Sequence, residues 1–109
     1  MEHTKAARAG YDSVTAEMVA AGADTGMMMG MPCLKIGGKL FAGLAADGMT
    51  FKLDGDAHAS ALALRGARIF DPSGRRPMRQ WVEVPAAHAG RWPELAHAAL
   101  EFVSTRDKR

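Results

Sequence analysis

The chain has 109 residues, the length of one ordinary domain, and its proportions of 48% hydrophobic and 24% charged residues argue against intrinsic disorder. The formal charge of +2 is too small to favour a nucleic-acid partner by itself. Cys33 is the only cysteine, so an internal disulfide is excluded and a reducing compartment fits.

The polar N-terminal residues are unlike a signal peptide, and no apolar run approaches the ~18 residues of a membrane span. We therefore expect one cytoplasmic domain over residues 1–109.

The first predicted element is a helix over residues 4–21. It is indicated by an apolar stripe at helical spacing, formed by Tyr11, Val14, Met18 and Ala21. Gly22 suits the position just past a helix end, where a left-handed conformation favours glycine. Gly10 weakens the prediction for the early turns because glycine disfavours a helix interior.

An antiparallel meander of three strands is predicted next. Gly37-Gly38 and Asp47-Gly48 are typical of hairpin turns. The first strand, about residues 26–36, contains Pro32, so we expect an edge strand or a bulge there. In the second strand, alternation places Leu40, Ala42 and Leu44 on one face of the sheet and Phe41 on the other.

The second half of the chain predicts a helix, two strands and a final helix. Asp54-Gly55-Asp56 opens the first helix, over residues 56–64, with either aspartate as the capping residue. Strands follow at 67–70 and 80–84, separated by an Asp71-Pro72-Ser73-Gly74 turn and a basic loop. Residues 86–91 form a connection to a last helix, which runs from Pro93 to about Thr105.

The predicted order α-β-β-β-α-β-β-α indicates an α+β fold with two layers, an antiparallel sheet with helices on one face. The other face then needs solvent or a covering partner. Its apolar material favours a homodimer or another protein partner, and we assign to it Phe41, Met27, Met29 and Met31.

The run from Gly26 to Trp81 resembles the TfoX/Sxy N-terminal-domain-like family. Its three motifs are Met28-Met29-Gly30, Gly38-Lys39-Leu40-Phe41-Ala42 and Met78-Arg79-Gln80-Trp81. The family usually has phenylalanine where Met29 stands. The resemblance implies a compact, secretion-chaperone-like stand-alone domain with a regulatory role, since the named member is linked to control of bacterial competence. It implies no catalytic residue.

The densest charge lies in a cluster of five arginines, Arg65, Arg68, Arg75, Arg76 and Arg79. Their planar guanidinium groups match the oxygens of an anion or a nucleic acid, and the neighbouring Trp81 could stack on a base. The alternatives are a solvated loop or pairing with acids such as Asp71, and for Trp81 a place in the core. We favour these alternatives because such clusters are common.

No catalytic or metal constellation stands out. Cys33 and its neighbouring methionines are soft copper(I) donors, but no second cysteine supports such a site, and core filling is favoured. The histidines lack zinc spacing, and His97 with Glu101 suits a surface hydrogen bond. Apolar neighbours of Cys33 would raise its thiol pKa. We therefore predict no catalytic, cofactor-binding or metal-binding residue.

The favoured function is a non-enzymatic binding or regulatory domain. Nucleic-acid binding through the arginine cluster is the alternative, and an enzyme with an unrecognised site ranks third.

Overall fold

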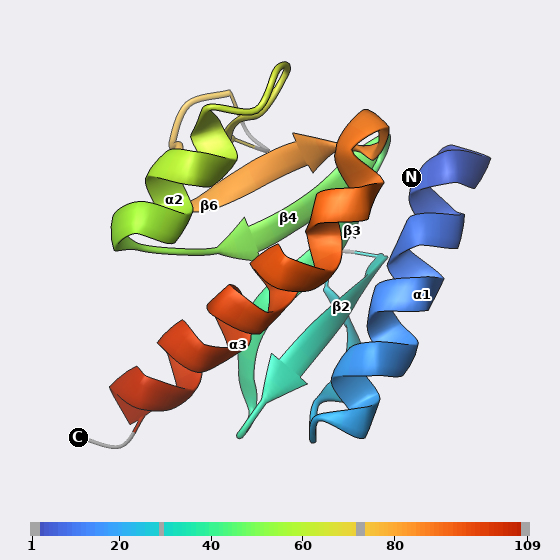
Figure 1. Ribbon diagram of the computed structural model, residues 1–109, viewed down its shortest axis with the longest axis vertical. Coiled ribbons are helices and arrows are strands. Elements are labelled where there is room, and N and C mark those ends of the chain that lie inside the picture. Colours follow the sequence, from blue (N-terminus) through green and yellow to red (C-terminus); the bar gives the residue numbers. More distant parts are fainter. Residues whose placement is uncertain (1–2, 29, 72–73, 108–109) are drawn as a thin grey trace.

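A computed structural model describes residues 3–28, 30–71 and 74–107 (Figure 1). The elements are α1 (Lys5–Ala20), β1 (Asp24–Met28), β2 (Met31–Ile36), β3 (Lys39–Ala45), β4 (Gly48–Lys52), α2 (Gly55–Leu62), β5 (Arg68–Phe70), β6 (Met78–Pro85), the 3₁₀ helix η1 (Ala86–Arg91) and α3 (Trp92–Asp107).

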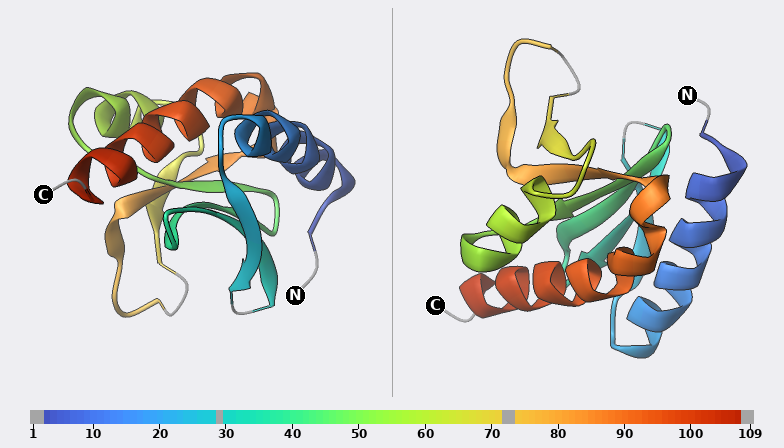
Figure 2. Two further views of the ribbon diagram at one scale, coloured as in Figure 1. Left: turned by 90° about the horizontal axis from the view of Figure 1, so that it is seen from below. Right: turned by 45° about the horizontal axis from the view of Figure 1, so that its top comes forward.

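The strands form one antiparallel sheet in the order β1-β2-β3-β4-β6-β5. The three α-helices lie together on one face of this sheet (Figure 2). The predicted α+β class, with an antiparallel sheet and helices on one face, is confirmed.

The sheet contains one strand more than predicted, because the stretch expected as a single strand over residues 26–36 folds as the β1–β2 hairpin. Gly30 has a φ of 81° in the turn, a left-handed conformation that favours glycine. The break that the sequence shows at this glycine is therefore a reversal of the chain.

Pro32 lies in β2, an inner strand, so of the two predicted explanations, an edge strand or a bulge, the edge strand was wrong. Pro32 is opposite Met27 on β1, but the pairing of β2 with β3 begins one residue later, with Cys33 opposite Gly43. The proline therefore lies outside the β2–β3 ladder, where its missing N–H group interrupts no pairing.

A bulge in β3 changes which residues are buried. Leu34 pairs with Ala42, but Lys35 pairs with Leu40, so β3 contains one additional residue, Phe41. Phe41 and Ala42 are successive in sequence, yet both are fully buried in the hydrophobic core. The prediction that Phe41 lies on the helix-free face was wrong, because a bulge interrupts the alternation of side chains along a strand.

Glycines form the first turn of the meander and stand directly after the second. Gly37 and Gly38 have φ values of 58° and 81°, which confirms the predicted two-residue hairpin. The next turn is Ala46-Asp47, one residue earlier than predicted, because Gly48 is already paired in β4. A Cβ atom at Gly48 would collide with the backbone carbonyl of Val84, so this strand position requires glycine.

The start of α1 is held at the β3–β4 turn. Thr4 is the N-cap, and its hydroxyl oxygen accepts a hydrogen bond from the Ala7 N–H at 3.1 Å. The same hydroxyl donates to a carboxylate oxygen of Asp47 at 2.9 Å. At the other end of α1, Gly22 has a φ of 105°, as its predicted position past the helix end requires.

The core lies between the helical layer and the sheet. Three of the four predicted stripe residues, Tyr11, Val14 and Met18, are buried in it, whereas Ala21 lies past the end of α1 and is exposed. Trp92 is the largest fully buried side chain. The α2 helix begins after Asp54, but no capping hydrogen bond from the Asp54 side chain forms. Gly10 lies directly against the Trp92 ring, which explains why a glycine occupies this position inside α1.

Replacing Gly10 by alanine is expected to destabilise the fold. The new Cβ atom would lie 2.7 Å from Cζ3 of the fully buried Trp92 ring, which has no room to move aside. Overpacking of this kind costs about 1–3 kcal/mol, against a gain of about 1 kcal/mol in helix propensity. Urea unfolding should therefore give a lower free energy of unfolding for Gly10→Ala. Gly90→Ala is the control, since no atom lies within 4 Å of its added Cβ. Equal or greater stability of Gly10→Ala would contradict the proposed contact.

Tyr11 is the single tyrosine of the chain, so its titration can be measured directly as a second test. Tyr11 is only 3% exposed, and burial raises its pKa to about 12, with a partly offsetting contribution from the Thr15 hydroxyl. Tyrosine in an unfolded chain titrates near pH 10. The contribution of the buried, protonated phenol to the free energy of unfolding is therefore complete below about pH 10 and is lost as the pH rises toward 12. Ultraviolet absorbance should record the late titration of the phenol, and Tyr11→Phe should remove this part of the alkaline stability loss. Titration near pH 10 in the folded protein would refute the assignment.

Candidate functional site

The face of the sheet that the helices leave uncovered forms a trough. The sheet is strongly curved, and the β1–β2 and β5–β6 hairpins extend away from the helices on either side of it (Figure 2). The trough has a volume of about 560 Å³. Typical ligand pockets occupy roughly 300–1,000 Å³, so the trough is large enough to hold a ligand or part of a partner chain.

Large apolar side chains line both walls of the trough. Met28 and Met31 come from the β1–β2 hairpin, whereas Phe70, Met78 and Trp81 come from the β5–β6 hairpin. Met28 is 47% exposed and Met78 is 40% exposed. Exposed methionines facing one another across a concave surface are typical of an interaction site.

The floor of the trough is made of small residues. Gly43 and Ala45 of β3 and Thr50 of β4 line it. Gly43 is opposite Thr50 in the ladder, and the Thr50 hydroxyl donates to the Gly43 carbonyl at 3.3 Å. These residues add little side-chain volume between the walls of the trough.

One end of the trough is charged. Arg68 and Glu83 pair across β5 and β6, and an Arg68 guanidinium nitrogen lies 3.5 Å from a Glu83 carboxylate oxygen. The Arg68 side chain is 73% exposed and that of Glu83 only 20%. A long, exposed ion pair contributes little to stability. The Arg68 guanidinium therefore remains accessible to an anionic group that enters the trough.

The five arginines predicted as an anion site lie on successive parts of the chain. Arg65 is in the turn after α2, where its carbonyl accepts a hydrogen bond from His88 Nε2 of η1 at 2.8 Å. The other four belong to the β5–β6 hairpin, and they are Arg68, Arg75, Arg76 and Arg79. Of the five, only Arg68 lines the trough itself.

Two histidines anchor the base of this hairpin. In addition to the His88 contact, His58 Nε2 of α2 lies 2.8 Å from the backbone carbonyl of Arg79. A carbonyl oxygen only accepts hydrogen bonds, so in each contact Nε2 donates and carries the proton. These histidines hold the hairpin against the helical layer, a structural role that the sequence did not indicate.

His97 makes a different surface contact from the one predicted. Its Nε2 lies 2.6 Å from a carboxylate oxygen of Glu17 on α1, so the hydrogen bond joins α3 to α1. Glu101, the predicted partner, instead lines a shallow depression beside α3. The helix packing brings Glu17 to His97, although the two residues are distant in sequence.

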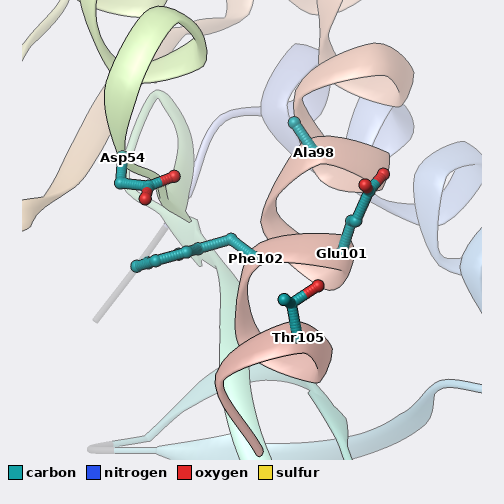
Figure 3. A pocket seen from close by; sticks show the side chains of 5 residues that line it. All are labelled: Asp54, Ala98, Glu101, Phe102 and Thr105. Carbon is teal, nitrogen blue, oxygen red and sulfur yellow. The ribbon is translucent and has the colours of Figure 1, made fainter. Parts of the chain in front are cut away.

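The depression beside α3 offers little chemistry (Figure 3). It is lined by Asp54, Ala98, Glu101, Phe102 and Thr105. The Phe102 ring extends beneath Asp54, whereas the Glu101 carboxylate points along the helix on its other flank (Figure 3). The two carboxylates are thus not arranged as a pair. Within residues 3–28, 30–71 and 74–107, no group of three or more His, Cys, Asp or Glu side chains is placed to hold a metal ion.

The prediction that Trp81 and the methionines near Cys33 fill the core was wrong for several of these residues. Trp81 is only partly buried and lines the trough, so the favoured core position was wrong. Met31 packs partly against the core, but Met27 and Met28 are exposed, which corrects the core-filling interpretation for those two. Met29 lies outside the described residues.

Cys33 is a buried, protonated thiol. It is 4% exposed, and burial raises its pKa, an effect that the nearby Lys35 ammonium partly offsets. A raised pKa reduces the thiolate fraction at neutral pH, and the thiolate is the reactive form. The environment of Cys33 is therefore that of an inert side chain, as its apolar neighbours in sequence predicted.

Leu40, Phe70 and Met78 line the trough, although no pattern in the sequence indicated them as site residues. Met78 fell within the stretch interpreted as a basic loop, and Phe70 was treated only as the end of a strand. The available signal was their type, since large apolar residues next to a cluster of arginines are unusual in a solvated loop.

Comparisons with protein-family models, with characterised proteins and with solved structures give no match to this chain. In the part of the chain that the structure describes, no helix combines the length and apolar character needed to cross a bilayer.

Cys33 should react slowly with a thiol reagent. In the folded protein, alkylation by iodoacetamide at neutral pH is expected to be at least about tenfold slower than in urea, because burial limits both access and thiolate formation. The rate should increase with pH into the alkaline range without a plateau near neutrality. Mass spectrometry at timed intervals measures the modification. Alkylation in the folded state as fast as in urea would identify an accessible, activated thiol instead.

Proposed function

We propose that this protein is a non-enzymatic protein-binding domain of regulatory type, and that the trough receives an apolar segment of its partner. The observation that carries the proposal is the lining of the trough, with Met28 and Met31 facing Phe70, Met78 and Trp81 across a floor of small residues. Flexible methionines adapt to different apolar side chains, and aromatic rings supply large contact areas.

The resemblance to the TfoX/Sxy N-terminal-domain-like family supports the same conclusion. Residues from all three motifs that carry the resemblance contribute to the trough, namely Met28, Leu40, Met78 and Trp81. We therefore interpret these motifs as parts of a shared binding surface. On this view the chain acts as a cytoplasmic regulatory domain without catalytic residues, and a second copy of the chain is one candidate partner.

Nucleic acid remains the less favoured partner class. Four of the five arginines do share one projecting hairpin (Figure 2), and Trp81 belongs to β6 of the same hairpin. However, Met78 and Trp81 of that hairpin face an apolar trough, where a base would meet methionine and small floor residues. Stacking platforms for single strands instead combine aromatic rings with a continuous basic groove.

Selection from a displayed library of random peptides tests the proposal without knowledge of the partner. The wild-type domain should enrich a family of peptides that contain large apolar residues. The double variant Met28→Gln/Met78→Gln should bind these peptides at least about tenfold more weakly, because polar side chains replace the exposed apolar walls. Fluorescence anisotropy with the enriched peptides provides the dissociation constants.

The matched control is Met27→Gln/Val19→Gln. Met27 and Val19 are 64% and 47% exposed, so they resemble the tested residues in exposure, but neither lines the trough. This variant should bind like the wild type. Failure to enrich any peptide family, or equal losses in both double variants, would refute the proposed function.

A further inference from the structure

We propose that the segment bound in the trough is an acidic amphipathic helix of a partner protein. This inference rests on the proposed function, and it specifies the chemistry of the occupant. It follows from three features of the described residues: the distribution of charge over the molecule, the hydrogen bonding of the floor and the limited extent of the apolar lining.

Charge is divided between the two faces of the molecule. The β5–β6 hairpin, which forms one wall of the trough, carries four arginines against two acids, Asp71 and Glu83. Lys52 of β4 is opposite Trp81 and adds a further positive charge beside this wall. The three α-helices, on the other face, carry six acidic residues against three basic ones. The positive charge beside the trough is therefore concentrated on one wall, formed by the β5–β6 hairpin with Lys52, and we call this wall the rim.

A positive rim selects an acidic partner. Opposite charges at the edge of an interface accelerate association and exclude partners of like charge. Arg68 is the positive group that lines the trough, and its side chain is 73% exposed. Two carboxylates line the trough as well: Glu83 pairs with Arg68, and Asp71 accepts a hydrogen bond from the Gly74 N–H at 2.9 Å. Arg75 and Arg76 precede the wall residue Met78 in the same hairpin. A segment with apolar anchors on one side and carboxylates on the other meets both requirements.

The floor of the trough favours a helix over an extended strand. The strands β2, β3, β4 and β6 each pair with neighbours on both sides, so their backbone groups are used within the sheet. An extended peptide lying over this floor would bury unpaired N–H and C=O groups, which is costly in an apolar site. A helix satisfies its own backbone and inserts apolar side chains at positions i, i+3, i+4 and i+7.

A second copy bound face to face is a weaker occupant. It would bring two β5–β6 hairpins together, and each carries more arginines than acids. Stable dimers also bury about 800 Å² on each partner, whereas the large exposed apolar side chains of this face, Met28 and Met78, both lie in the trough. A single amphipathic segment fits such a site without opposing like charges.

Three fluorescein-labelled synthetic peptides of equal length test the inference. The first has leucines at helical spacing with glutamates elsewhere, the second has lysines in place of the glutamates, and the third has the composition of the first with its leucines spread around the helix. Fluorescence anisotropy should show that the first binds at least about tenfold more tightly than either of the others. Its affinity should fall as salt is raised, because exposed charges are screened.

Charge reversal on the rim should remove this preference. Arg75→Glu/Arg76→Glu is expected to bind the acidic peptide about tenfold more weakly and to bind the basic peptide more tightly. Lys5→Glu/Arg8→Glu is the matched control, because it changes the net charge equally on α1, in the helical layer. It should retain the preference of the wild type, and circular dichroism should confirm that both variants are folded.

The outcomes separate this inference from the proposed function. Equal affinity for the acidic and basic peptides, or for the ordered and scrambled acidic peptides, would overturn the inference while peptides from the library still bind the trough. Loss of library binding would instead remove the proposed function. Two further results would also overturn the inference. One is tighter binding of single-stranded DNA than of the acidic peptide. The other is self-association, measured by sedimentation, that persists when the acidic peptide is added.

Discussion

The contact between Trp92 of α3 and Gly10 of α1 allows the two long helices to approach each other closely on one face of the sheet. Trp92 is the first residue of α3, and its fully buried ring occupies the space that a side chain at position 10 would fill. The two long helices can therefore pack together on one face of the sheet. With all three α-helices on that side, the opposite face is left uncovered.

Irregular pairing makes this open face concave. The ladder shifts by one residue between β2 and β3. It shifts by three residues between β5 and β6, where Ile69 pairs with Val82 but Phe70 pairs with Met78. Such irregularities bend strands and increase their twist. In β3 the shift also moves Phe41 into the core, so that small residues remain on the floor of the trough. The feature that buries a large aromatic ring on one side thus creates space on the other.

Much of the fold could be predicted because its signals are local. The Gly37-Gly38 turn follows from backbone freedom, and the stripe of Tyr11, Val14 and Met18 follows from helical spacing. The prediction was wrong for Phe41, because a bulge depends on the pairing between strands and leaves no mark on a single strand. It was wrong for Trp81 for a related reason: alternation indicates that neighbouring residues lie on opposite faces, but not which face the helices cover. The trough therefore could not be predicted from the sequence, although most of its wall residues lie in segments that were correctly predicted as strands.

The hydrogen bonds of His58 and His88 have a consequence for how this protein can diverge. Both histidines bind main-chain carbonyl groups, at Arg79 and Arg65, rather than side chains. Every amino acid offers the same carbonyl, so the hairpin would keep its attachment if these arginines were replaced. The charge of the rim can therefore change by substitution while the hydrogen bonds that hold this part of the fold in place stay the same.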